Sequence, residues 1–272
     1  MNISKNKKAG ICKLCGKETF LTFEHVPPKA AFNNLPVRKI ESDDLINMIS
    51  DPLRKPWDFE GVHGKDMQKG SGDYYLCQSC NNNTGDWYIK EYVKFSREIE
   101  KIEYEIDDPK RNQFTINDIY PLRIFKAIMT MFCDINNNCF GDEKLREFLL
   151  NKESTEFDNN KYQLYLYFPK GSIMRMCPYS VLGFTDGFNL SVSEISRYPI
   201  GLALYFDKPD DYCPEGILIN DMLNYGYYDK TNYNFENVPF LNINSSFPAD
   251  YRTKEEIEDC MNECNEEMIK EI

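Results

Sequence analysis

The apolar side chains of the second half of the chain recur with two different periods. Over residues 121–132 they follow helical spacing, and Pro121 suits the first turn of such a helix. A second helix is predicted over residues 143–150. Runs rich in tyrosine and leucine predict strands instead. These strands are expected over residues 162–168 and 195–206, with weaker candidates over 174–184 and 216–223.

A last helix is predicted over residues 253–272. One stripe of this helix holds Ile257, Cys260, Met261, Cys264 and Met268. Cys260 and Cys264 are one helical turn apart, but no second pair of thiols or imidazoles accompanies them. We therefore interpret the stripe as a core-facing surface and not as a metal site.

The first 95 residues predict two short strands and a helix. One strand covers 20–23 and ends at Glu24-His25, where two prolines stop it. The second covers 74–76, and a helix is expected to begin near Asn82. That helix carries Trp87, Tyr88, Tyr92, Val93 and Phe95 at helical spacing, which we interpret as core and not as a base-stacking platform. Residues 33–73 read as a long loop-rich insert, which is typical of a functional or partner-facing segment.

Composition narrows the class of protein. The chain has 272 residues, of which 42% are hydrophobic, so it can bury a sizeable core. No stretch approaches the ~20 continuous apolar residues of a membrane span, and no apolar run follows the basic N-terminus as in a secretory signal. Ten cysteines in this context indicate an intracellular metalloprotein and not a disulfide framework. We expect a cytoplasmic protein with no membrane partner.

Charge is unevenly distributed along the chain. The formal net charge is −12, which argues against a general nucleic-acid coat. Residues 1–40 nevertheless carry a balance of +6, whereas residues 95–272 carry −14. The basic part is compatible with contact to phosphate. The acidic part is expected to be a solvated surface for the most part, although it could also face a basic partner protein.

A charged stretch over residues 98–111, broken by Pro109, marks the expected domain boundary. We predict an N-terminal module over 1–95 and an accessory domain over 96–272. The accessory domain should be α+β, with mixed helices and antiparallel sheet, and should serve target choice, regulation or oligomerisation. It contains no histidine and no glycine-rich phosphate loop, so His-dependent chemistry is excluded there.

Four cysteines in two C-x-x-C pairs organise the N-terminal module. Cys12 and Cys15 form the first pair, and Cys77 and Cys80 form the second. Two such pairs separated by a long insert predict a tetrahedral zinc site with four thiolate ligands. Because four protein ligands leave no open position on the ion, this zinc should be structural, with any catalysis beside it.

Polar residues beside the predicted zinc site suggest a second, catalytic ion. Glu24 precedes His25 at the end of the first strand, and Asn81 directly follows the last cysteine. A carboxylate and an amide oxygen are hard ligands suited to Mg²⁺ or Mn²⁺. His25 could act as general base on a water molecule, and Lys29 could contact a phosphate. Together these groups supply what phosphodiester hydrolysis needs.

These motifs resemble the HNH endonuclease family and its zinc-bound ββα-metal (treble-clef) fold. The residues that carry the resemblance are Cys-x-x-Cys-Gly, Leu-Thr-Phe-Glu-His-Val-Pro-Pro-Lys and Leu-Cys-x-x-Cys-Asn-x-x-Thr-Gly, within about residues 10–95. The Glu-His pair followed by Asn is similar to the phage endonuclease VII type. The resemblance implies that Glu24 and Asn81 hold the catalytic divalent ion, that His25 activates water, and that the four cysteines bind zinc. It also implies cleavage of nucleic acid, most simply DNA, to 5′-phosphate and 3′-hydroxyl ends, in a restriction or phage-defence setting.

Two departures from the family pattern stand out. Glu24 replaces the more common aspartate, and the last position is Asn81 where many members have histidine. The insert between His25 and Cys77 is also long, so pairing of the two predicted strands across it is an assumption.

Each candidate residue also has a plainer interpretation. The cysteines could be small buried apolar residues, and His25 could be a structural histidine, but the repeated spacing and the neighbours of His25 favour the functional interpretation. Lys29 could equally be a surface lysine. His63, in Gly-Val-His-Gly, could help to bind metal or phosphate, although an exposed loop residue is the favoured interpretation.

The competing function is a non-catalytic zinc-finger module that binds nucleic acid or a protein partner. Treble-clef domains commonly bind without chemistry, so the fold alone does not distinguish the two. Under either function a homodimer or an activating protein partner remains open.

Overall fold

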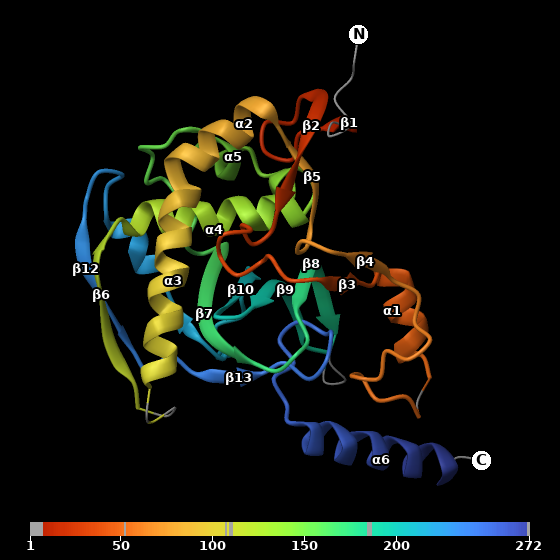
Figure 1. The fold of residues 1–272 in the computed structure, drawn as a ribbon. Helices are drawn as coiled ribbons and strands as arrows, with labels where there is room; N and C mark the ends of the chain where they lie inside the picture. The colour runs from red at the N-terminus through yellow and green to blue at the C-terminus, as the bar shows by residue number, and fades with distance from the viewer. Residues whose placement is uncertain (1–7, 52, 107, 109–110, 184–186, 271–272) are drawn as a thin grey trace.

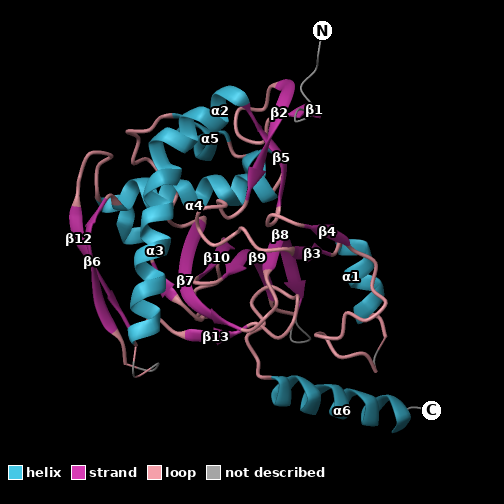
Figure 2. Cartoon of the chain, in the orientation of Figure 1, coloured by secondary structure: helices cyan, strands magenta, loops and turns pink. Residues whose placement is uncertain are grey.

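The computed structural model describes residues 8–51, 53–106, 108, 111–183 and 187–270. Within them the chain is a mixture of helices and mostly antiparallel sheets, as predicted (Figures 1 and 2). The α-helices are α1 (Ser42–Ile49), α2 (Gln78–Thr84), α3 (Lys90–Glu105), α4 (Pro121–Ile135), α5 (Glu143–Leu150) and α6 (Lys254–Lys270). None of the helices in the described part of the chain combines the length and the apolar character that spanning a bilayer requires.

A three-stranded antiparallel sheet forms the N-terminal part. It contains β1 (Lys8–Ile11), β2 (Glu18–His25) and β5 (Gly72–Cys77) in the order β1-β2-β5. Strand β2 pairs with β5 from Leu21 opposite Cys77 to His25 opposite Gly72, so the pairing assumed across the insert is confirmed. Helix α2 follows β5 directly and begins at Gln78, four residues earlier than predicted. The earlier start follows from Cys77, whose sulfur accepts the Cys80 amide as the N-cap.

The insert between β2 and β5 is more regular than predicted. It contains the antiparallel pair β3 (Val37–Lys39) and β4 (Lys65–Met67), and helix α1 lies between them. The loop-rich prediction was wrong for these three elements. Strands of three residues with charged side chains offer no apolar alternation, so the sequence pattern could not reveal them.

The larger sheet follows the order β11-β7-β10-β9-β8, and β13 pairs with β7 in parallel. Its strands are β7 (Tyr162–Lys170), β8 (Arg175–Gly183), β9 (Asn189–Arg197), β10 (Ile200–Phe206), β11 (Ile217–Leu218) and β13 (Phe240–Asn242). The predicted strand over 195–206 is two strands, β9 and β10, because the chain turns at Tyr198-Pro199. Of the candidate over 216–223, only Ile217–Leu218 form a strand (β11), and its second half belongs to the 3₁₀ turn η3 (Asn220–Asn224). Residue 184 of the candidate over 174–184 lies outside the described residues.

One buried cluster joins the N-terminal sheet to the rest of the molecule. Helix α2 continues through a π-helical turn, η1 (Gly85–Ile89), into α3, and α3 packs on α4 (Figure 1). Tyr88, Tyr92 and Phe95 are buried as predicted. The ring of Phe95 lies 5.9 Å from that of Phe235 in β12 (Thr231–Glu236), which pairs with β6 (Gln113–Ile119). The division predicted at residue 95 therefore falls inside α3, and residues on both sides of it share this core.

Helix α6 corrects the prediction for the C-terminal stripe. Ile257 is buried, but Cys260 and Cys264 are exposed, so they are not core residues. The side chain of Met268 lies outside the described residues. The exposure of the two cysteines agrees with the position of α6, which lies along the outside of the molecule next to the insert (Figure 1). Glu258 accepts a hydrogen bond from Lys55 of the insert.

Candidate metal centre and active site

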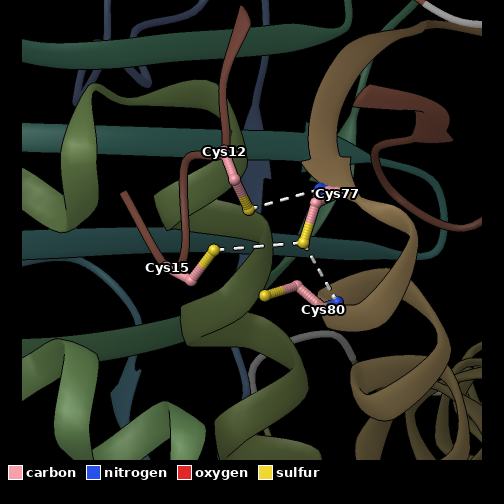
Figure 3. A group of neighbouring side chains, drawn as sticks. All are labelled: Cys12, Cys15, Cys77 and Cys80. Carbon is pink, nitrogen blue, oxygen red and sulfur yellow. Dashed lines mark hydrogen bonds between the residues drawn. The ribbon is translucent and has the colours of Figure 1, made fainter. Parts of the chain in front are cut away.

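The four cysteines of the two C-x-x-C pairs converge at one point (Figure 3). Cys12 and Cys15 lie in the turn after β1, Cys77 ends β5, and Cys80 lies in the first turn of α2. Their sulfur atoms all lie within 4.8 Å of one another, and the Sγ atoms of Cys15 and Cys77 are 3.9 Å apart. In a zinc tetrahedron with Zn–S bonds of about 2.3 Å, the sulfurs lie about 3.8 Å apart. The cluster could therefore hold a metal ion such as zinc.

Hydrogen bonds within the cluster favour thiolate at the first ligand position. The backbone amide of Cys77 donates to the Sγ of Cys12 at 3.2 Å. A side-chain hydrogen bond from Cys80 and several backbone amides lower the pKa of Cys12 to about 4. The same hydrogen bond and burial raise the pKa of Cys80, because its proton is held between the two sulfurs. A metal ion would take the place of that proton.

Glu24 and Asn81 meet on the side of the sheet that faces α2. The Nδ2 of Asn81 donates hydrogen bonds to Glu24 Oε1 and, at 3.0 Å, to Thr22 Oγ1. The Thr22 hydroxyl lies 3.1 Å from Glu24 Oε1 and 3.0 Å from the carbonyl oxygen of Leu76. Burial raises the pKa of Glu24 to about 7, against the opposing effect of the Thr22 hydroxyl. A cation beside the carboxylate would favour its charged form.

The imidazole of His25 contacts Lys69 and Phe23, and only one of its two ring nitrogens is hydrogen-bonded within the described residues. Its Nε2 lies 3.0 Å from the carbonyl oxygen of Lys69, and because a carbonyl only accepts, Nε2 carries the proton in this contact. The Nδ1 atom then keeps its lone pair. The imidazole packs edge-on against Phe23, with 5.1 Å between the ring centres. Burial lowers the pKa of His25, the hydrogen bond with the Lys69 carbonyl opposes this effect, and the positive charge of Lys29 lowers the pKa further, so the neutral ring is favoured at pH 7.

Sequence reasoning missed the residues that fix the end of β2. The buried amide of Asn33 donates to the carbonyl oxygens of Pro27, at 2.7 Å, and Ser71, at 2.8 Å, and its Oδ1 accepts from the Ser71 amide. Gly72 lies so close to β2 that a Cβ there would be 2.1 Å from the backbone oxygen of Glu24. The sequence signal was the run Gly70-Ser71-Gly72, which marks a close approach of backbones.

An open groove of about 740 Å³ runs beside His25. It lies between the β2–β5 pair and the β3–β4 pair, and its lining includes Phe23, Tyr74 and the exposed residues Lys65 and Lys69. Two lysines beside two aromatic rings form a surface that suits a phosphate backbone and its bases. The insert therefore forms one wall of the candidate site.

Of the two other candidate residues, Lys29 lies beside Glu24 and His25, whereas His63 does not. Lys29 is exposed and lines a small cavity together with Glu24 and His25. His63 is exposed in its loop, as favoured from the sequence, and its Nδ1 lies 3.3 Å from Asp44 Oδ2. The fold thus brings Glu24, His25 and Lys29 together and leaves His63 apart from them.

Comparison of the chain with protein-family models, with curated proteins and with solved structures found no match. The chemistry of the site is therefore inferred from its own geometry.

Proposed function

We propose that this chain is a metal-dependent HNH-type endonuclease that hydrolyses phosphodiester bonds of nucleic acid. The observation that carries the proposal is the direct contact between Glu24 and Asn81 beside the four-cysteine cluster. These residues are 57 positions apart, and the folded chain brings their side chains together at the level of His25. The HNH resemblance implies two paired strands followed directly by a helix, with the cysteines where the second strand meets the helix. The arrangement of β2, β5 and α2 agrees with this.

The two kinds of donor set suit two different ions. Four thiolates suit a structural zinc with a closed coordination sphere. The Glu24 carboxylate and the Asn81 amide oxygen suit Mg²⁺ or Mn²⁺. When bound, such an ion would neutralise charge on a phosphate oxygen and on the leaving 3′ oxygen. For Asn81 to offer its oxygen, its amide must turn away from the Glu24 contact seen here.

His25 supplies the general base. Its Nε2 is occupied by the Lys69 carbonyl, so Nδ1 is the atom that takes a proton from water. As the water oxygen bonds to phosphorus and the P–O3′ bond breaks, the products are a 5′-phosphate and a 3′-hydroxyl after protonation of the leaving oxygen. The hydrogen bond to Lys69 and the contact with Phe23 keep the ring oriented for this step.

The test of the proposed function is cleavage of supercoiled plasmid with Mg²⁺, Mn²⁺ or EDTA, extended to branched and single-stranded DNA and to RNA. We expect nicked or linear products only with a divalent ion, and a loss of at least about 100-fold in rate for Glu24→Gln, which keeps the size of the side chain. No turnover on any substrate, with nucleic-acid binding retained in both proteins, would support the non-catalytic binding module instead.

The groove lysines should set the electrostatic part of nucleic-acid binding. For the double variant Lys65→Ala/Lys69→Ala we expect weaker binding of DNA of every sequence. The slope of log K against log salt concentration should fall in magnitude by about two, because each lysine that neutralises a phosphate releases about one counterion. Fluorescence anisotropy over a salt series measures this slope. The control Lys101→Ala/Lys144→Ala removes the same charge from exposed positions away from the groove and should leave the slope unchanged.

A further inference from the structure

A small cavity of about 150 Å³ lies where α4 meets the candidate active site. The N-terminal part contributes Glu24, His25 and Lys29 to its wall, and α4 contributes Thr130, Met131 and Asp134. Helix α4 also contacts β5 directly. One wall of the cavity is therefore formed by a helix from outside the predicted nuclease module. Figure 1 shows α4 beside β5.

The carboxyl group of Asp134 in α4 is buried, but not all of its hydrogen-bonding capacity is satisfied. Its exposed fraction is 5%, and its Oδ1 has no hydrogen-bond partner among the described residues. Burying an ionised carboxylate without partners is costly, so such groups are normally paired or bound to a metal. The Nζ of Lys13, whose positive charge favours ionised Asp134, is hydrogen-bonded to Asn137 instead.

A second carboxylate lies near Asp134. Burial first, and then repulsion from Glu24, raise the pKa of Asp134. Two carboxylates that line one small cavity repel each other when both are charged. A divalent cation in that cavity would relieve this repulsion and would also satisfy the unpaired oxygen of Asp134.

We propose that Asp134 belongs to the divalent-cation site as a third oxygen donor, beside Glu24 and Asn81. The proposal rests on the proposed function, because it assumes that Glu24 and Asn81 hold a divalent ion. It assigns to α4 a direct part in the active site, so the predicted accessory part would complete the metal site that the N-terminal part begins. Three oxygen donors suit Mg²⁺ or Mn²⁺, which keep water on their remaining positions.

The test is Mn²⁺ binding to the zinc-loaded full chain, measured by calorimetry and by the loss of the free-Mn²⁺ electron paramagnetic resonance signal. The proteins compared are the wild type, Asp134→Asn, Glu24→Gln and the control Asp118→Asn, which changes an exposed carboxylate on β6. Asp134→Ser, a smaller substitution, repeats the test in case the Asn variant does not fold. Far-UV circular dichroism and the melting temperature without Mn²⁺ report folding.

We expect the wild type and Asp118→Asn to bind Mn²⁺ with the same Kd, and Asp134→Asn to bind at least tenfold more weakly. Without Mn²⁺ its melting temperature should be equal to or above that of the wild type, because the buried carboxyl group, which is unfavourable when ionised, is removed. A Kd for the Asp134 variants within twofold of the wild type, with binding lost in Glu24→Gln, would overturn the role of Asp134 alone. Absence of Mn²⁺ binding and of cleavage in the wild type would overturn the proposed function and this inference with it.

Discussion

Replacing His25 with alanine is expected to lower the rate of DNA cleavage about 10²- to 10⁴-fold, the range that a positioned general base contributes. The loss should appear in the maximal rate and not in the affinity for DNA, because His25 acts on water and not on the phosphate backbone. Its Nε2 is already engaged by the Lys69 carbonyl, so the substitution removes the proton acceptor Nδ1. Single-turnover cleavage with saturating protein measures the rate, and anisotropy measures the affinity.

His63→Ala is the matched control for this substitution. It removes the other histidine of the chain, which is exposed and contacts Asp44 in the insert. We expect His63→Ala to cleave like the wild type. If His25→Ala cleaved at the wild-type rate, the role of His25 as general base would be wrong. If both variants lost activity, a residue of the insert would also take part in catalysis.

Removal of the metal from the four-cysteine cluster is expected to unfold the N-terminal sheet and α2. Structural zinc sites contribute roughly 10–16 kcal/mol of apparent binding free energy at pH 7, which is comparable to or larger than the whole stability of an ordinary domain. Here the ion would join β1, β5 and α2, which have no disulfide between them. Without it, closely packed sulfurs would have to share protons or move apart.

Cys77→Ser tests this expectation without a chelator, and Cys213→Ser, an exposed cysteine, is its control. Zinc content by mass spectrometry should fall from one ion per chain in the control to well below one in Cys77→Ser. Far-UV circular dichroism should show a matching loss of structure. A Cys77→Ser protein with unchanged spectrum and melting temperature would contradict the structural role of the ion.

Much of the fold could be predicted because its elements carry strong local patterns. Helices α4 and α5 follow apolar periodicity, and β7 is a continuous tyrosine- and leucine-rich run. The metal cluster was predictable because tight turns impose the C-x-x-C spacing. The contact between Glu24 and Asn81 was predictable, because Glu24 lies at the end of a strand and Asn81 directly follows the last cysteine of the cluster.

The features that could not be predicted depend on contacts between distant parts of the chain. The hydrogen bonds of Asn33 to Pro27 and Ser71 leave no periodic signal, because a single polar residue in a loop resembles any other. Asp134 is one acidic residue within an apolar helix, and its place at the cavity follows only from how α4 packs. The exposure of Cys260 and Cys264 likewise depends on what α6 lies against, which its amphipathic pattern does not specify.

The unbroken passage from α2 through η1 into α3 has a consequence for how this protein can be divided. A fragment ending at residue 95 would expose Tyr88, Tyr92 and Phe95, which are now covered by α4 and by β12. Such a fragment should aggregate or stay unfolded even with zinc present. Residues 1–95 therefore do not form an independently folding unit: transferring the proposed cleavage site to another protein would require α4, and the sheet that supports it, along with the cysteines.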